Sequence, residues 1–155
     1  MLSKGYEYVD ADKVSLKEAK KSYISNSILL KARLFYDGGY YKKSFSELEK
    51  IEHPDLFSNK ENIIEYWYRK GRVSQKMGKS QEEIFIFFKQ AIDVGLKSNT
   101  YYASMSILQM AIEYEKAGDT EQAESYYNQC LNLHGFDYER GIHQQAKAGL
   151  QRIKD

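Results

Sequence analysis

The sequence predicts an all-α protein built from helical hairpins, and three observations support this fold class. Apolar residues recur at helical spacing along most of the chain, glycines divide these stretches at nearly even intervals, and alternating strand patterns are nearly absent. One proline among 155 residues and an abundance of Glu, Gln, Lys, Ala, Leu and Tyr also suit helices. The length fits one domain, and a sheet-based enzyme fold is set aside.

The chain begins with a polar stretch, residues 1–14, that carries no helical pattern and is expected to be an extended arm. Ser15 and Glu18 have the spacing of a capping box, in which two side chains bond to free backbone amides at the start of a helix. A long helix is therefore expected from Ser15 to Tyr36, and residues 15–155 are assigned to one helical repeat domain.

The first hairpin is expected at about residues 25–57, with Gly39 at its turn. Glycine readily takes the left-handed conformation that ends a helix, and Pro54 stops the returning helix. Helical spacing on both sides of the turn predicts one apolar face for each helix. The residues of these faces are Ile28, Ala32, Phe35, Ser44, Leu48 and Ile51.

The second hairpin is expected at about residues 60–97, around Gly78, with Ser80 and Glu83 as another capping box. Its returning helix contains IFIFF, residues 84–88, the most apolar run of the chain. A helix between its own partner and the next hairpin needs apolar groups on more than one side, which favours a core role. The alternative is an exposed patch for a partner or for dimerisation.

The third hairpin is expected at about residues 99–134, hinged at Gly118, with Asp119 or the residue after it as the cap of the second helix. Ala111 and Ala123 are expected where the two helices cross, because larger side chains there would push the backbones apart. The apolar faces of this hairpin are formed by Ile107, Met110, Ala111, Tyr114, Ala123, Tyr127, Cys130 and Leu131.

A closing helix is expected at about residues 138–154. Such a helix caps a row of hairpins, because the last hairpin would otherwise expose an apolar face without a neighbour. Its inner stripe consists of Ile142, Ala146, Gly149, Leu150 and Ile153.

The succession of small, aromatic, Gly-Asp, small and aromatic residues across 107–133 resembles the tetratricopeptide repeat, and Trp67 with Gly71 fits the same pattern. The resemblance implies a right-handed α-solenoid of three degenerate hairpin repeats with a capping helix. Lys70 and Ser74 depart from the apolar residues that the family usually has there, so looser packing is expected around them. The last third of the chain also resembles the C-terminal end of larger repeat proteins of unknown function, which implies a C-terminal domain.

The chain lacks the sequence motifs that carry catalysis. His53, His134 and His143 are scattered, without an i, i+4 histidine pair or a nearby cysteine pair, so no metal site is expected. No glycine-rich phosphate loop follows a strand, and no serine sits in a nucleophile elbow, so neither a cofactor nor enzyme activity is expected. Cys130, the single cysteine, is interpreted as a small core residue rather than a reactive thiol.

Charge and hydropathy narrow the classes of partner. A net charge of +1, with acids and bases interspersed, predicts no binding of nucleic acid. No run approaches the roughly 18 apolar residues of a membrane span, and no secretory signal is present, so a soluble cytoplasmic protein without membrane insertion is expected. If Met1 is an artificial start within a longer chain, the compartment stays open.

In tetratricopeptide proteins the leading helices line a concave groove, and the resemblance assigns groove residues to this chain. The middle of the assigned set is basic and aromatic and its far end is apolar, which suits a peptide with an acidic group and a hydrophobic anchor. The peptide-binding candidates are Arg33, Tyr36, Tyr68, Arg69, Arg72, Lys76, Met105, Gln109 and Ile112, and the other groove positions are Asn26, Leu29, Glu65, Leu108 and Lys116.

We therefore expect a non-catalytic scaffold that binds a protein or peptide partner. A carboxylate clamp of the kind that grips chaperone tails is not expected, because Leu29, Arg33 and Arg69 stand where that clamp has Lys and Asn. Two other interpretations stay open. The basic side chains simply keep a helix face solvated, or the domain self-associates as a homodimer through IFIFF or its tyrosines.

Overall fold

The structure is a computed structural model that describes Leu16, residues 27–98 and residues 100–155. The regular elements in these residues are helices, with no strand among them, which confirms the predicted all-α class. The predicted arm at residues 1–14 and the capping box after it lie outside the described residues. The helices span residues 27–37, α2 (Tyr41–Glu49), the 3-10 helix η1 (Pro54–Leu56), α3 (Lys60–Lys76), α4 (Gln81–Gly95), α5 (Tyr101–Lys116), α6 (Thr120–Leu131) and α7 (Glu139–Arg152).

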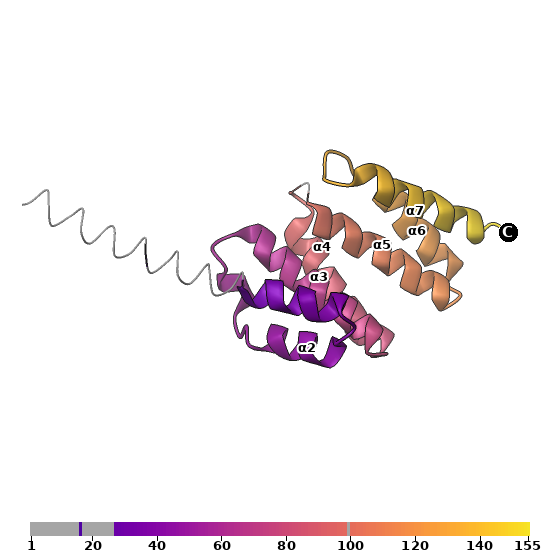
Figure 1. The fold of residues 1–155 in the computed structure, drawn as a ribbon. Helices are drawn as coiled ribbons and strands as arrows, with labels where there is room; N and C mark the ends of the chain where they lie inside the picture. Colours follow the sequence, from indigo (N-terminus) through magenta and orange to yellow (C-terminus); the bar gives the residue numbers. More distant parts are fainter. Residues whose placement is uncertain (1–15, 17–26, 99) are drawn as a thin grey trace, which may run out of the picture.

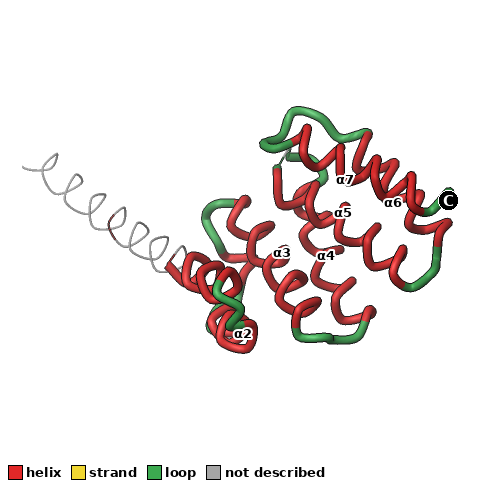
Figure 2. The backbone as a smooth tube through the Cα atoms, turned by 45° about the vertical axis from the view of Figure 1, so that its right-hand side comes forward, coloured by secondary structure: helices red, strands yellow, loops and turns green. Residues whose placement is uncertain are grey.

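From α2 onward, each long helix packs against the next one along the chain (Figure 1). α5 also contacts α3 and α7, so it lies in the middle of this part of the fold. Figure 2 shows the same helices from another side, with turns joining successive neighbours. Within the described residues, no helix combines the length and the apolar character needed to cross a lipid bilayer.

Glycines form the turns between paired helices, as the sequence predicts. Gly39, Gly78 and Gly118 have φ values of 80°, 67° and 79°, in the left-handed region where a side chain would be strained. The helices that follow two of these turns are capped as expected. The side chains of Ser80 and Asp119 each accept a hydrogen bond from the backbone amide three residues later, at 3.3 and 3.1 Å.

The larger hydrophobic core lies between α3, α4, α5, α6 and α7. Ala111 and Ala123, the small residues expected at the crossing of the third hairpin, are both fully buried in it. Cys130 is also fully buried, and burial raises the pKa of its thiol to about 11, which confirms its interpretation as a core residue. The largest fully buried side chains of this core are Tyr127, Phe88, Ile64, Ile107, Leu108, Met110 and Ile142.

The IFIFF run of α4 belongs mainly to the larger core. Ile84, Phe85 and Phe88 are buried, whereas Ile86 is exposed. Phe88 packs so closely on α3 that a Cβ atom added at Gly71 would come within 2.5 Å of its ring. The core interpretation of the run is therefore confirmed.

A smaller core lies between residues 27–37, α2 and one side of α3. Ser44 is fully buried beside it, and its hydroxyl donates a hydrogen bond to the carbonyl oxygen of Ala32 at 2.6 Å. This bond joins α2 to the preceding helix without leaving a buried hydroxyl unpaired. The buried members of the smaller core are Leu29, Ala32, Leu48, Tyr66 and Val73.

Candidate functional site

A cavity of about 480 Å³ opens where residues 27–37, α3 and the first turn of α5 come together, and the turn before α7 borders it. Five of the nine peptide-binding candidates line this cavity, and they come from two different helices. We call it the groove pocket. The five candidates are Arg33, Tyr36, Tyr68, Arg69 and Arg72.

The other four candidates lie elsewhere. Lys76 borders a separate depression beside the turn at Gly39. Met105 and Ile112 are half-buried against the larger core, and Gln109 is buried but contacts Arg72. Of the three leading helices along which a groove is predicted, the first two and the start of the third line the pocket.

Two leucines that were predicted to line the groove are buried instead. Leu29 was expected to face the groove, yet it is buried in the smaller core, and Leu108 is buried in the larger one. Both helices pack on more than one side, so positions next to the packing stripe are also covered. The expectation that these two residues line the groove is therefore wrong.

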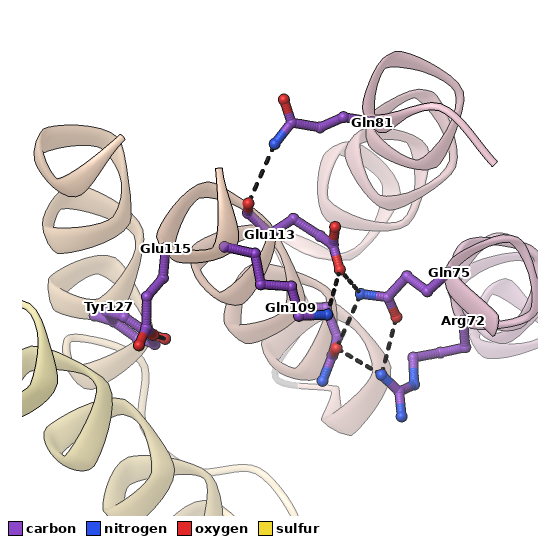
Figure 3. Close-up of polar contacts among 8 residues, drawn as sticks. Arg72, Gln75, Gln81, Gln109, Glu113, Glu115 and Tyr127 are labelled. Carbon is purple, nitrogen blue, oxygen red and sulfur yellow. Dashed lines mark hydrogen bonds and ion pairs between the residues drawn. The ribbon is translucent and has the colours of Figure 1, made fainter. Parts of the chain in front are cut away.

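The Arg72 side chain is held in place by hydrogen bonds to the side-chain amides of two glutamines, one on α3 and one on α5. Its Nη1 atom donates hydrogen bonds to Gln75 Oε1 at 2.9 Å and to Gln109 Oε1 at 2.5 Å. Gln75 Nε2 in turn donates to Glu113 Oε1 at 2.7 Å, which extends the network along α5 (Figure 3). The guanidinium also lies over the Tyr36 ring, 5.8 Å from its centroid. Among the described residues, Arg72 forms no ion pair.

The other two arginines of the groove pocket are paired with carboxylates. Arg69 forms an ion pair with Glu65 at 2.6 Å, and both side chains are largely buried. Arg33 is 3.7 Å from Asp37, and both side chains are exposed, so this pair is weak. Arg72 is therefore the groove arginine whose charge is left without a carboxylate in the described part of the chain.

Tyrosines give the pocket its aromatic walls. Burial raises the pKa of Tyr68 far above its ordinary value, and burial followed by the nearby charge of Glu65 raises the pKa of Tyr102. Both phenols are therefore neutral near pH 7. The Tyr68 ring lies 5.4 Å from that of Tyr102 and 6.4 Å from that of Tyr101, centroid to centroid. A ligand that enters the pocket meets aromatic surface on this side.

Several pocket residues escaped the sequence reasoning. Tyr101 and Tyr102 begin α5 and line the pocket. The signal that could have identified them is the pair of aromatic residues at the start of a predicted helix. Asp137 and Tyr138 reach the pocket from the turn after α6, and Tyr138 has a left-handed φ of 61°. No pattern in the sequence indicates that this distant turn folds back on the groove. Asp37, Glu61 and Asp137 also line the pocket, so its wall carries both signs of charge.

The same turn brings together two of the histidines that the motif search treated as scattered, and adds an acidic residue to them. His134, Glu139 and His143 lie close enough for each to offer one ligand atom to a single metal ion. The search for closely spaced metal ligands did not find this group, because only Glu139 and His143 share a helix and His134 reaches them through the turn. This cluster is distinct from the groove pocket.

No protein-family model matches the chain, and no curated protein sequence is significantly similar to it. The function is therefore argued from the pocket itself.

Proposed function

We propose that this protein is a non-catalytic interaction module of tetratricopeptide-like architecture that binds a peptide segment of its partner in the groove pocket. The architectural part of the proposal is supported by the packing order. Successive helices form hairpins, and α5 contacts both α3 and α7, its next-but-one neighbours. Stacked hairpins produce this arrangement, and a right-handed solenoid of three such repeats is its simplest extension.

The observation that carries the binding proposal is the position of Arg72. Its guanidinium borders a cavity, is held by two glutamine side chains, and lacks a carboxylate partner among the described residues. A partly buried arginine without a counter-ion favours an incoming carboxylate, to which its planar N–H groups can donate in parallel. We propose that an Asp, a Glu or a chain-terminal carboxylate of the partner occupies this place.

The aromatic walls supply the second half of the recognition. Tyr36, Tyr68 and Tyr102 surround the arginines with aromatic rings that can cover an apolar side chain. The acidic residues of the wall, Asp37 and Glu61, disfavour a strongly acidic segment. The best fit is a peptide with one carboxylate beside one aromatic or aliphatic residue.

The proposal is tested by selecting peptides from a random displayed library against the wild-type protein. The affinities of the selected peptides are then measured by calorimetry for wild type and for Arg72→Met. We expect a loss of at least about tenfold, because a hydrogen bond to a charged group contributes about 1.5–3 kcal/mol. Arg72→Lys should lose less, since it keeps the charge without the planar group.

The matched control is Lys89→Met, which removes an exposed cation on α4 outside the pocket lining. It should leave the affinities unchanged, and thermal unfolding should show that all variants are folded. If Arg72→Met binds the selected peptides as tightly as wild type does, the groove pocket is not the binding site.

Self-association is the second candidate, and one observation favours it. Leu30 and Leu34 are 53% and 60% exposed, one turn apart on the helix of residues 27–37. Two such leucines on one helix face can pair with the same face of a second copy. Sedimentation equilibrium decides this point. A dimer that is lost in the Leu30→Ser, Leu34→Ser double variant supports self-association, and a monomer at all concentrations rejects it.

A further inference from the structure

The turn that joins α6 to α7 gathers His134, Glu139 and His143 at one end of α7. The atoms that could bind a metal, one from each residue, all lie within 4.8 Å of one another. Two imidazoles and one carboxylate are a ligand set that divalent transition metals accept, and the three residues lie outside the groove pocket.

The backbone fixes which nitrogen of His143 faces the cluster. His143 Nε2 lies 2.9 Å from the carbonyl oxygen of Leu133. A carbonyl oxygen only accepts hydrogen bonds, so Nε2 carries the hydrogen and Nδ1 of the neutral ring presents its lone pair. The side chain is only 14% exposed and its ring contacts Phe136, so this orientation is held by packing. Histidines that bind metals commonly donate their second N–H in this way.

The side chain of Glu139 is also held in a defined position. Its Oε2 atom accepts a hydrogen bond from the backbone amide of Gly135 at 2.9 Å. Its Oε1 atom lies 2.7 Å from His134 Nδ1 and 3.9 Å from His143 Nδ1. One carboxylate oxygen of Glu139 therefore lies beside an imidazole nitrogen of each histidine, and its negative charge would attract a cation bound between the three side chains.

These distances suit a tetrahedral ion. Zinc binds nitrogen and carboxylate oxygen at about 2.0–2.2 Å, which places neighbouring ligand atoms roughly 3.3 Å apart. The observed separations of 2.7 and 3.9 Å fall on either side of that value. Small movements are sufficient to reach it, and the His134 side chain is 69% exposed, so few neighbours oppose such a movement.

We propose that His134, Glu139 and His143 form a binding site for a divalent transition metal, with Zn²⁺ as the preferred ion. The nitrogen ligands disfavour Mg²⁺ and Ca²⁺, which prefer oxygen. Three protein ligands leave a fourth position for water or an anion. Arg140 and Lys147 share a surface depression with Glu139 and His143, and their positive charge favours an anion at that position.

The test uses full-length protein without an affinity tag, titrated with Zn²⁺ by calorimetry and with Co²⁺ by visible absorption. Wild type should bind one ion per chain, and Co²⁺ should show the spectrum of a tetrahedral site. Each of His134→Ala, Glu139→Gln and His143→Gln should weaken Zn²⁺ binding by at least about tenfold. Zn²⁺ should also raise the thermal unfolding temperature of wild type, and this rise should be lost in the variants.

The matched control is His53→Ala, which removes the one histidine outside the cluster and should bind Zn²⁺ as wild type does. Circular dichroism should show that every variant keeps its helices. The proposal is overturned if wild type binds no Zn²⁺, if the three ligand variants bind it unchanged, or if His53→Ala weakens binding as much as they do.

Discussion

The two hydrophobic cores differ in size and in what borders them. The larger core, between α3 and α7, buries apolar and aromatic side chains from five helices. The smaller core, under residues 27–37, is bordered by polar groups. Among these, Lys70 forms an ion pair with Glu49 and lies over the rings of Phe45 and Tyr66. Burial lowers the pKa of Lys70, but the hydrogen bond to Glu49 and the interaction with Tyr66 together raise it more, so the pKa is raised overall.

The difference explains where the groove pocket lies. A helix that is packed on all sides has no surface left for a ligand, and α5 approaches this condition over most of its length. α3 packs on α4 and α5 with one face, whereas in the described part of the chain its other side meets the smaller core. Arg69 and Arg72 project from α3 where the large core ends, so binding groups lie at the boundary between the two cores.

The largest expected losses of stability come from truncating one buried side chain in each core, and they allow the two cores to be compared directly. Phe88→Ala removes a fully buried ring from the larger core and should lower the free energy of unfolding by about 3–5 kcal/mol. Leu48→Ala in the smaller core should cost about 2–3 kcal/mol, since the surrounding chain can collapse more easily. Urea denaturation measures both values.

Hydrogen exchange then tests whether the cores are independent. Leu48→Ala should accelerate exchange in residues 27–49 and leave α5 and α6 protected, whereas Phe88→Ala should accelerate exchange throughout. If both variants accelerate exchange equally in every helix, the two cores unfold as one and the comparison fails.

A medium effect is expected where α7 packs on the larger core. A Cβ atom at Gly149 would overlap the ring of Tyr127, which is fully buried. Gly149→Ala should therefore destabilise the protein by about 1–3 kcal/mol, although alanine is the better helix former. Gly141 lies on the same helix with open space around it, so Gly141→Ala should stabilise by up to about 1 kcal/mol. Thermal unfolding compares the two, and equal shifts would mean that α7 is not closely packed at Gly149.

The sequence predicted the helices and turns well because they depend on local signals. Gly78 and Gly118 end helices through their left-handed conformation, and Ser80 caps α4, as short-range patterns indicate. The IFIFF run of α4 was also assigned correctly to the core. These features need only a few neighbouring residues, so they can be read without knowledge of tertiary contacts.

The candidate site was predicted only in part because its partners come from distant helices. Periodicity places Arg72 beside the packing stripe, but it does not show that Gln109 supplies the bonding amide. Leu29 lies one helical turn before Arg33 and Leu108 lies next to Gln109, and only packing decides that the two leucines are buried. The Lys70 departure from the repeat pattern is likewise explained by its partners in space.

The smallest expected effect concerns an ion pair on the outer edge of the larger core. Glu115 accepts hydrogen bonds from Arg152 Nε at 2.7 Å and from Arg152 Nη2 at 3.0 Å, and the Tyr127 hydroxyl donates to the same carboxylate. Figure 3 shows Glu115 beside Tyr127. The bonds from Arg152, partly opposed by burial and assisted by Tyr127, hold the pKa of Glu115 below its ordinary value of about 4.5.

A lowered carboxylate pKa adds stability that is present above about pH 4.5 and is lost as the pH falls through the folded-state value. Urea denaturation from pH 7 to pH 3 should show this loss for wild type, and Glu115→Gln should lack that part of the pH dependence. At pH 7 the variant should be less stable by no more than about 1 kcal/mol, because Arg152 is largely exposed. Glu124→Gln, at an exposed position on α6, should keep the wild-type pH profile. If the two variants have the same profile, the ion pair does not anchor α7, and apolar packing, to which Ile142 and the contact at Gly149 belong, holds it on the larger core.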